Sequence, residues 1–174
     1  MRVGVLAVQG AFAEMKAMFL ERDDEVFEIR RLRDLDGGMD RLAFPGGEST
    51  VQGLLLKKLG LFDPLKAMIE DGLPVFATCA GLILLAERLE DDPAVWFGCL
   101  PVTVRRNAYG RQLGSFSTVG TWDGHPDTRM TFIRAPQITS VAPDVDVLSE
   151  FEGRPTSVRW RNITAFTWHP ELGM

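Results

Sequence analysis

The stretch Val75-Phe76-Ala77-Thr78-Cys79-Ala80-Gly81-Leu82-Ile83-Leu84 decides the fold of this chain. Its first part belongs to the run Leu73–Thr78, which is apolar except for Thr78. Such a run predicts a strand buried on both faces, as in a parallel sheet covered by helices. A helix is predicted directly after it, over Ala80–Leu89. Cys79 therefore stands at a junction between a buried strand and a helix.

Upstream of this stretch, short apolar runs alternate with amphipathic segments. The patterns predict strands over Val3–Val8, Glu25–Ile29 and Arg41–Phe44, and helices over Ala11–Glu21 and Ser49–Lys58. Another helix is expected to close at Gly72, with Asp63 as its N-cap and Pro64 at its first helical position. The order β-α-β-β-α-α-β-α is typical of an open α/β sheet.

The second half of the chain changes to short strand patterns separated by turns. These strands are predicted over Val102–Val104, Ser115–Thr121, Met130–Ile133, Val145–Glu150, Thr156–Trp160 and Ile163–Thr167. We therefore expect an α/β fold with an open, mostly parallel sheet, helices on both faces and an appended antiparallel section. The length of 174 residues favours a single domain over residues 1–174.

Composition excludes several classes of protein. The 19 basic and 24 acidic residues give a net charge of −5, which argues against nucleic-acid binding. No apolar run approaches the roughly 20 residues of a membrane span. Only two cysteines are present, Cys79 and Cys99, so we expect a reducing, cytoplasmic compartment and no disulfide framework. No zinc-ligand spacing occurs, and no metal is expected.

Cys79 is the candidate nucleophile. A sharp strand-to-helix turn presents a side chain at the carboxyl end of a sheet, and the small residues Ala77, Ala80 and Gly81 permit such a turn. The start of a helix favours a thiolate and offers amides to an oxyanion. A buried cysteine that only packs is the alternative from position alone. Cys99 precedes Leu100-Pro101 with no helix behind it, so we expect it to be a packing residue.

His169 is the candidate base, with Glu171 as the group that orients it. Residues i and i+2 of an extended chain point to the same side, and Pro170 is expected to keep this segment extended. Glu171 would then accept a hydrogen bond from one imidazole nitrogen while the other faces Cys79. The alternative is an ordinary strand terminus. His125 lies in the polar turn Trp122–Asp127 and is interpreted as a solvated loop residue.

Two further segments are candidates for binding. The segment 43–50 reads as a strand, a Gly46-Gly47 turn and a helix start, and it fits an oxyanion loop better than a phosphate loop because it lacks the P-loop lysine. The basic cluster of residues 105–112 could bind a carboxylate or form a solvated, salt-bridged loop. Arg134, at a strand end, has the same two interpretations.

Six segments taken together resemble one family. They are Leu6–Phe12 (LAVQGAF), Pro45–Thr50 (PGGEST), Thr78–Gly81 (TCAG), Arg106–Gln112 (RNAYGRQ), Phe132–Pro136 (FIRAP) and His169–Leu172 (HPEL). The chain resembles the class I (triad) glutamine amidotransferases, which have a flavodoxin-like fold. More narrowly, it is similar to the glutaminase subunits of pyridoxal 5′-phosphate synthase, the PdxT/Pdx2 family, over nearly its whole length.

The resemblance implies a function for each matching position. Cys79 would attack the side-chain amide of L-glutamine, His169 would carry the proton and Glu171 would orient His169, without any cofactor. The amides of Gly47 and Ala80 would form the oxyanion hole. The matching substrate-binding positions are Gly47, Glu48, Ser49, Arg106, Ile133 and Arg134. Ammonia would pass to a (β/α)8-barrel synthase subunit that makes pyridoxal phosphate (vitamin B6). Members of the family are typically poor glutaminases until that partner docks.

Three positions depart from the family pattern. Ala77 stands where the broader pattern prefers glycine, and Met15 stands where the family has histidine. The chain ends at Gly173-Met174, where relatives continue into a final helix, so the C-terminal helix is expected to be short or absent.

Three alternative hypotheses are a glutaminase serving imidazole glycerol phosphate synthesis, a non-catalytic docking subunit, and a stand-alone cysteine hydrolase of the PfpI/DJ-1 type. The segments RNAYGRQ and FIRAP argue against the first, and a complete Cys79, His169 and Glu171 set argues against the second. The glycine turn and the C-terminal His-x-Glu argue against the third.

Overall fold

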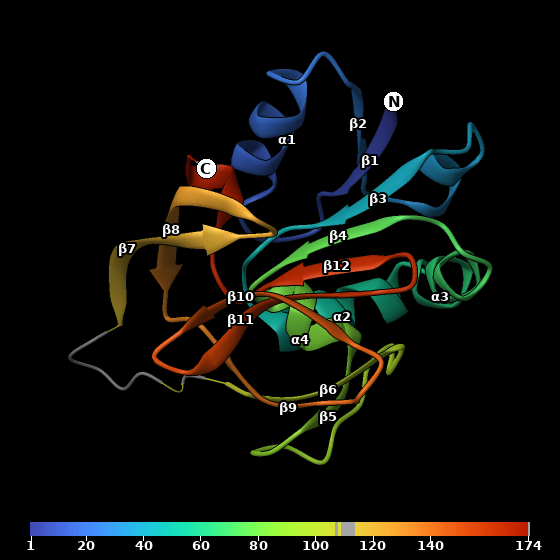
Figure 1. Ribbon diagram of the computed structural model, residues 1–174. Coiled ribbons are helices and arrows are strands. Elements are labelled where there is room, and N and C mark those ends of the chain that lie inside the picture. The colour runs from blue at the N-terminus through green and yellow to red at the C-terminus, as the bar shows by residue number, and fades with distance from the viewer. Residues whose placement is uncertain (107, 109–113, 174) are drawn as a thin grey trace.

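A seven-stranded sheet forms the centre of the computed structural model, which describes residues 1–106, 108 and 114–173 (Figure 1). The strand order is β10-β11-β12-β4-β3-β1-β2. Strands β1, β2, β3, β4 and β12 run parallel, while β10 and β11 add antiparallel pairs at one edge. Their bounds are β1 (Arg2–Leu6), β2 (Glu25–Ile29), β3 (Arg41–Phe44), β4 (Val75–Thr78), β10 (Asp146–Phe151), β11 (Arg154–Trp160) and β12 (Ile163–Phe166). The expected open, mostly parallel sheet is confirmed.

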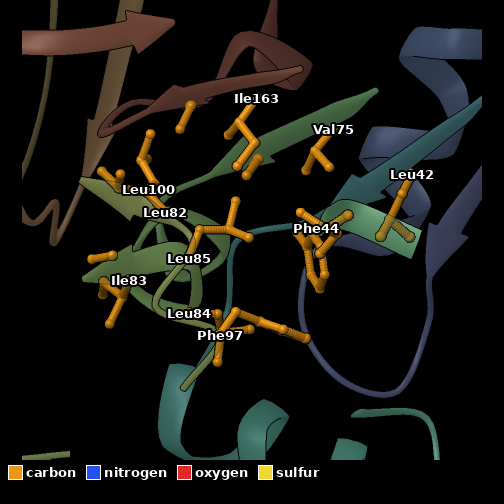
Figure 2. Packing of buried hydrophobic residues seen from close by; sticks show 14 of the residues in the cluster. Leu42, Phe44, Val75, Leu82, Ile83, Leu84, Leu85, Phe97, Leu100 and Ile163 are labelled. Atoms are coloured by element: carbon orange, nitrogen blue, oxygen red, sulfur yellow. The ribbon is translucent and has the colours of Figure 1, made fainter. Parts of the chain in front are cut away.

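Helices cover both faces of this sheet, as expected. Helix α1 (Phe12–Leu20) lies on one face, and α2 (Ser49–Lys58), α3 (Phe62–Glu70) and α4 (Ala80–Leu85) lie on the other (Figure 1). Alternate residues of each strand therefore enter different cores. In β3, Leu42 and Phe44 pack in the core of the α2–α4 side, which Figure 2 shows, whereas Ala43 packs with α1.

Met15, one of the departures from the family pattern, is fully buried in the core under α1. The other departure within the described residues, Ala77, lies in β4 between Phe44 and Ala165 and does not have a positive φ. Alanine is therefore compatible with the backbone at this position.

Two local predictions were wrong. The helix expected over Ala80–Leu89 ends at Leu85, and β5 (Ala86–Leu89) follows with its middle residues exposed. This strand pairs in parallel with β6 (Leu100–Arg105), so tertiary pairing overrides the local pattern. Asp63 is not the N-cap and Pro64 is not the first helical residue, because α3 begins at Phe62, two residues earlier than expected, after Leu61. Its carboxylate instead lies in the first helical turn, where the helix dipole favours negative charge.

The appended section consists of two small sheets. Strand β6 pairs antiparallel with β9 (Gln137–Val141), a strand that the sequence patterns did not predict. Strands β7 (Ser115–Trp122) and β8 (His125–Ile133) form a hairpin. His125 is exposed, as expected, but it begins β8 and is therefore a strand residue and not the loop residue that was predicted. Two short 3-10 helices, η1 (Leu32–Leu35) and η2 (Pro170–Leu172), were also not predicted.

Substitution of Gly81 by alanine should destabilise the fold. A Cβ at this position would lie 2.6 Å from Phe44 Cβ and 2.7 Å from Phe44 O, atoms that belong to a packed strand. We expect Gly81→Ala to lower the free energy of unfolding by about 1–3 kcal/mol, as overpacking does. Gly120→Ala is the control, because the nearest atoms to its Cβ would be the flexible end of Met130, at 3.3 Å and 3.7 Å. Equal urea-unfolding curves for the two variants would contradict this packing.

Candidate active site

Cys79 lies at a strained turn between β4 and α4. Its φ of 48° and ψ of −100° lie in a region that residues other than glycine rarely adopt. Its N–H donates to Phe166 O of β12 at 2.8 Å, so the neighbouring strand fixes the turn. Such a backbone costs of order 1–3 kcal/mol and is typical of functional sites. The predicted elbow is therefore present in the structure.

His169 comes to this edge of the sheet because it follows β12, the strand next to β4. Its N–H donates to Thr131 O of β8 at 2.9 Å, and the preceding Trp168 is fully buried. The imidazole itself is buried, with only 8% of the side chain exposed. The backbone and a buried neighbour thus hold the ring in place.

Glu171 accepts a hydrogen bond from this ring, with 2.8 Å between His169 Nδ1 and Glu171 Oε1. The sequence predicted that an extended segment would bring the two side chains together, and this was wrong. The 3-10 helix η2 begins at Pro170, and its turn brings them together instead. Thr78 Oγ1 donates to the same carboxylate oxygen at 3.1 Å. A residue of β4 therefore orients the carboxylate that orients the histidine.

The pKa of His169 is raised from its ordinary value of 6.5 to about 10. Burial lowers this pKa, but the interaction with the Cys79 sulfur and the hydrogen bond to Glu171, together with the negative charges of both groups, outweigh burial. Nε2 of His169 is buried and has no partner at ordinary hydrogen-bond length among the described residues. The Cys79 sulfur therefore lies near the imidazole without a hydrogen bond of ordinary geometry. The site favours the imidazolium form.

The glycine turn of residues 45–48 follows β3 and lies beside Cys79 and His169. A Cβ on Gly46 would lie only 2.5 Å from His169 Cε1, so the ring packs directly on this glycine. The N–H of Ala11 donates to Gly46 O at 2.9 Å. Gly10, with φ of 99°, approaches so closely that its Cβ would lie 2.0 Å from the same oxygen. Only glycine permits this contact.

A cavity of about 340 Å³ opens above Cys79. It is lined by residues from the loop after β1, the glycine turn, the elbow, the end of β6, the end of β8 and the C-terminal segment. These are Gln9, Ala11, Glu14, Gly46, Gly47, Glu48, Ser49, Cys79, Ile83, Arg106, Ile133, Arg134, His169 and Leu172. The structure thus brings together all six predicted substrate-binding residues, the thiol and the imidazole.

The remaining predicted residues lie directly behind this cavity. Ala80 is the first residue of α4, so its N–H has no acceptor within the helix. The side chain of Glu171 is fully buried behind His169.

Arg106 is already paired in this structure. Its guanidinium contacts Asp92 Oδ2 at 2.8 Å and Asp91 Oδ2 at 3.4 Å, and it donates to Thr50 Oγ1 at 3.3 Å. It is therefore a salt-bridged residue that also lines the cavity, and carboxylate binding by Arg106 stays a prediction. The rest of the predicted motif, residues 107 and 109–112, lies outside the described residues. Arg134 is exposed at the cavity, with φ of 42°.

Sequence reasoning did not assign several residues that shape the site. Gln9, Glu14 and Leu172 line the cavity, and Thr78 binds Glu171. Thr78 carried a usable signal, because it is the one polar residue in an apolar run. Among the described residues, no group of three or more His, Cys, Asp or Glu side chains could hold a metal ion.

The model of the SNO glutamine amidotransferase family matches residues 5–174. The chain belongs to the SNO glutamine amidotransferase family. Its similarity to a solved glutamine amidotransferase has a TM-score of 0.93 at 38% identity, covering 98% of this chain and 91% of that one.

The chain is also similar to proteins called pyridoxal 5′-phosphate synthase subunit PdxT. The protein of Desulfitobacterium hafniense is 52% identical over 99% of this chain and 86% of the relative. That of Bifidobacterium longum is 47% identical over 97% of this chain and 92% of the relative.

The two thiols of this SNO family member should differ in reactivity. Burial raises the pKa of Cys99 to about 11, so at pH 8 it remains a thiol. Cys79 lines the cavity beside an imidazolium. We expect iodoacetamide at pH 8 to alkylate Cys79 at least about 10-fold faster than Cys99, as measured by peptide mass spectrometry. Cys79→Ala is the control, and equal rates at the two thiols would contradict the site.

The histidine–carboxylate pair should make stability depend on pH. Because the folded-state pKa of His169 is about 10 and its ordinary value is 6.5, its stabilisation is fully present below pH 6.5 and is lost as pH rises towards 10. Glu171→Gln should reduce this effect. The difference in free energy of unfolding between the wild-type chain and Glu171→Gln, measured by urea unfolding, should therefore narrow from pH 6.5 to pH 10. A gap that widens over this range would contradict the pairing.

Proposed function

We propose that this chain is the glutaminase subunit of pyridoxal 5′-phosphate synthase and hydrolyses L-glutamine to glutamate and ammonia. The observation that carries this proposal is the connected arrangement of Cys79, His169 and Glu171 on one cavity, in a member of a glutamine amidotransferase family. The names of the PdxT relatives support the choice of synthase. The proposed unit is the single domain of residues 1–174.

In the proposed mechanism, the sulfur of Cys79 attacks the side-chain carbonyl carbon of glutamine and a C–S bond forms. The oxyanion receives hydrogen bonds from the N–H groups of Gly47 and Ala80. The C–N bond breaks while the His169 imidazolium gives its proton to the leaving ammonia. The neutral imidazole next takes a proton from water, which attacks the glutamyl thioester. Glutamate leaves and the thiolate–imidazolium pair is restored.

The cavity supplies charged side chains that match both ionised groups of a free amino acid. Glutamine carries an α-carboxylate and an α-ammonium group, and the cavity presents Arg106 and Arg134 together with Glu48. We propose that the two arginines hold the carboxylate and that Glu48 holds the ammonium group. Gly47, Ser49 and Ile133 complete the proposed binding surface. No cofactor takes part in this chemistry.

The proposed partner is a (β/α)8-barrel synthase subunit that uses the ammonia. An apolar side chain, Ile133, is 39% exposed at the cavity and offers surface for such a subunit to cover. We place the reaction in the cytoplasm because both cysteines are free thiols, as in reducing compartments. No helix in the described ranges is long and apolar enough to cross a membrane.

The alternatives explain less of the site. A docking subunit without turnover has no need for a strained elbow thiol beside a buried imidazolium. A stand-alone hydrolase of the PfpI/DJ-1 type leaves the contact between Gly46 and the imidazole unexplained.

Glutamate release tests the proposal directly. The chain is incubated with glutamine, alone and with a pyridoxal phosphate synthase barrel subunit. Release should rise when the barrel subunit is added and should fall at least about 10³-fold in Cys79→Ala, because the nucleophile is lost. Glutamate release by Cys79→Ala at the wild-type rate would contradict the mechanism. No release from a complex shown to form would favour the docking subunit.

A further inference from the structure

Gln52 is a fully buried polar residue of α2 that lies outside the cavity. Its Nε2 donates to Gln9 O at 3.0 Å and to Pro45 O at 3.3 Å. Both neighbours are carbonyl oxygens, so the amide must face them with its NH2 group. One side chain therefore joins the loop after β1 to the turn after β3.

The other end of this amide has no partner. Oε1 of Gln52 is buried and accepts no hydrogen bond from the described residues. A buried unpaired acceptor is destabilising, whereas an apolar side chain of the same length would fill the space without one. Packing alone does not account for a glutamine here. The two hydrogen bonds that its NH2 group donates do account for it.

These bonds belong to a network around the glycine turn. The side chain of Gln9 accepts from the N–H of Glu48 at 2.9 Å, and the N–H of Ala11 donates to Gly46 O at 2.9 Å. A Cβ on Gly47 would lie 3.0 Å from Gln52 Nε2, so Gln52 lies directly against the glycine that carries the proposed oxyanion donor. The network thus fixes both ends of the turn.

We propose that Gln52 is a positioning residue that holds the glycine turn in register with Cys79 by bridging the carbonyls of Gln9 and Pro45. Its effect on the reaction rests on the proposed glutaminase function. Removing its NH2 group leaves Cys79, His169 and the two arginines of the cavity in place but frees the turn. The loss then falls on stabilisation of the oxyanion, since small displacements of such a donor lower the rate strongly.

Gln52→Met is the informative variant, because methionine has similar length and volume but donates no hydrogen bond. With the barrel subunit and glutamine, we expect kcat to fall about 10- to 100-fold, in line with a displaced oxyanion donor. KM should rise by a smaller factor, because Glu48 lies on the turn but Arg106 and Arg134 do not. The melting temperature should fall only slightly, because loss of the two donated hydrogen bonds is partly offset by removal of the unpaired acceptor. Leu56→Ala, one helical turn further on and also fully buried, is the control: it should lower the melting temperature and leave kcat unchanged.

Amide hydrogen exchange tests the positioning without reference to activity. In Gln52→Met, the amides of Ala11 and Glu48 should exchange at least about 10-fold faster, while the Cys79 amide, bonded to Phe166 O, should not change. Unchanged exchange at Ala11 and Glu48 would overturn the proposal. Faster exchange with unchanged kcat would overturn its catalytic part. If the wild-type complex releases no glutamate, the proposed function fails, and exchange alone still decides whether Gln52 holds the turn.

Discussion

Parallel pairing of β4 with β3 on one side and with β12 on the other is the constraint on which the site depends. In this register, Phe44 lies beside Ala77 and Phe166 lies beside Thr78, so three strands end at one edge of the sheet. The chain then continues from β3 into the glycine turn, from β4 into Cys79 and from β12 to His169. Groups more than 30 residues apart in the sequence meet because parallel strands share their carboxyl edge.

Several contacts hold the backbone of Cys79 in its strained conformation. Its N–H is bonded to β12, Gly81 allows α4 to touch Phe44, and the side chain shares a cavity with His169. Buried, fully apolar residues continue through α4 on the side facing the larger core. The packing energy of that core offsets a backbone penalty of about 1–3 kcal/mol, which a surface turn would relieve by relaxing.

The sequence predicted those features that depend on neighbouring residues. The run before Cys79 is long and apolar enough to indicate a buried strand, and His169 and Glu171 are two residues apart. Prediction from the sequence failed where contacts with a distant segment determine the local structure. Residues 86–89 form a strand only because β6 lies alongside, and short apolar runs do not distinguish strand from helix. The hydrogen bonds from Thr78 to Glu171 and from Gln52 to Gln9 join segments 93 and 43 residues apart, and no local pattern encodes such contacts.

The proposed reaction depends on covalent acylation of the Cys79 thiol by the glutamyl group of glutamine. Mass spectrometry of the chain, bound to its barrel subunit and quenched in acid during turnover, tests this most directly. We expect a glutamyl adduct on the peptide that carries Cys79, and hydroxylamine should release it, as it does from a thioester. Turnover without any adduct on that peptide, or with the adduct on another residue, would contradict it.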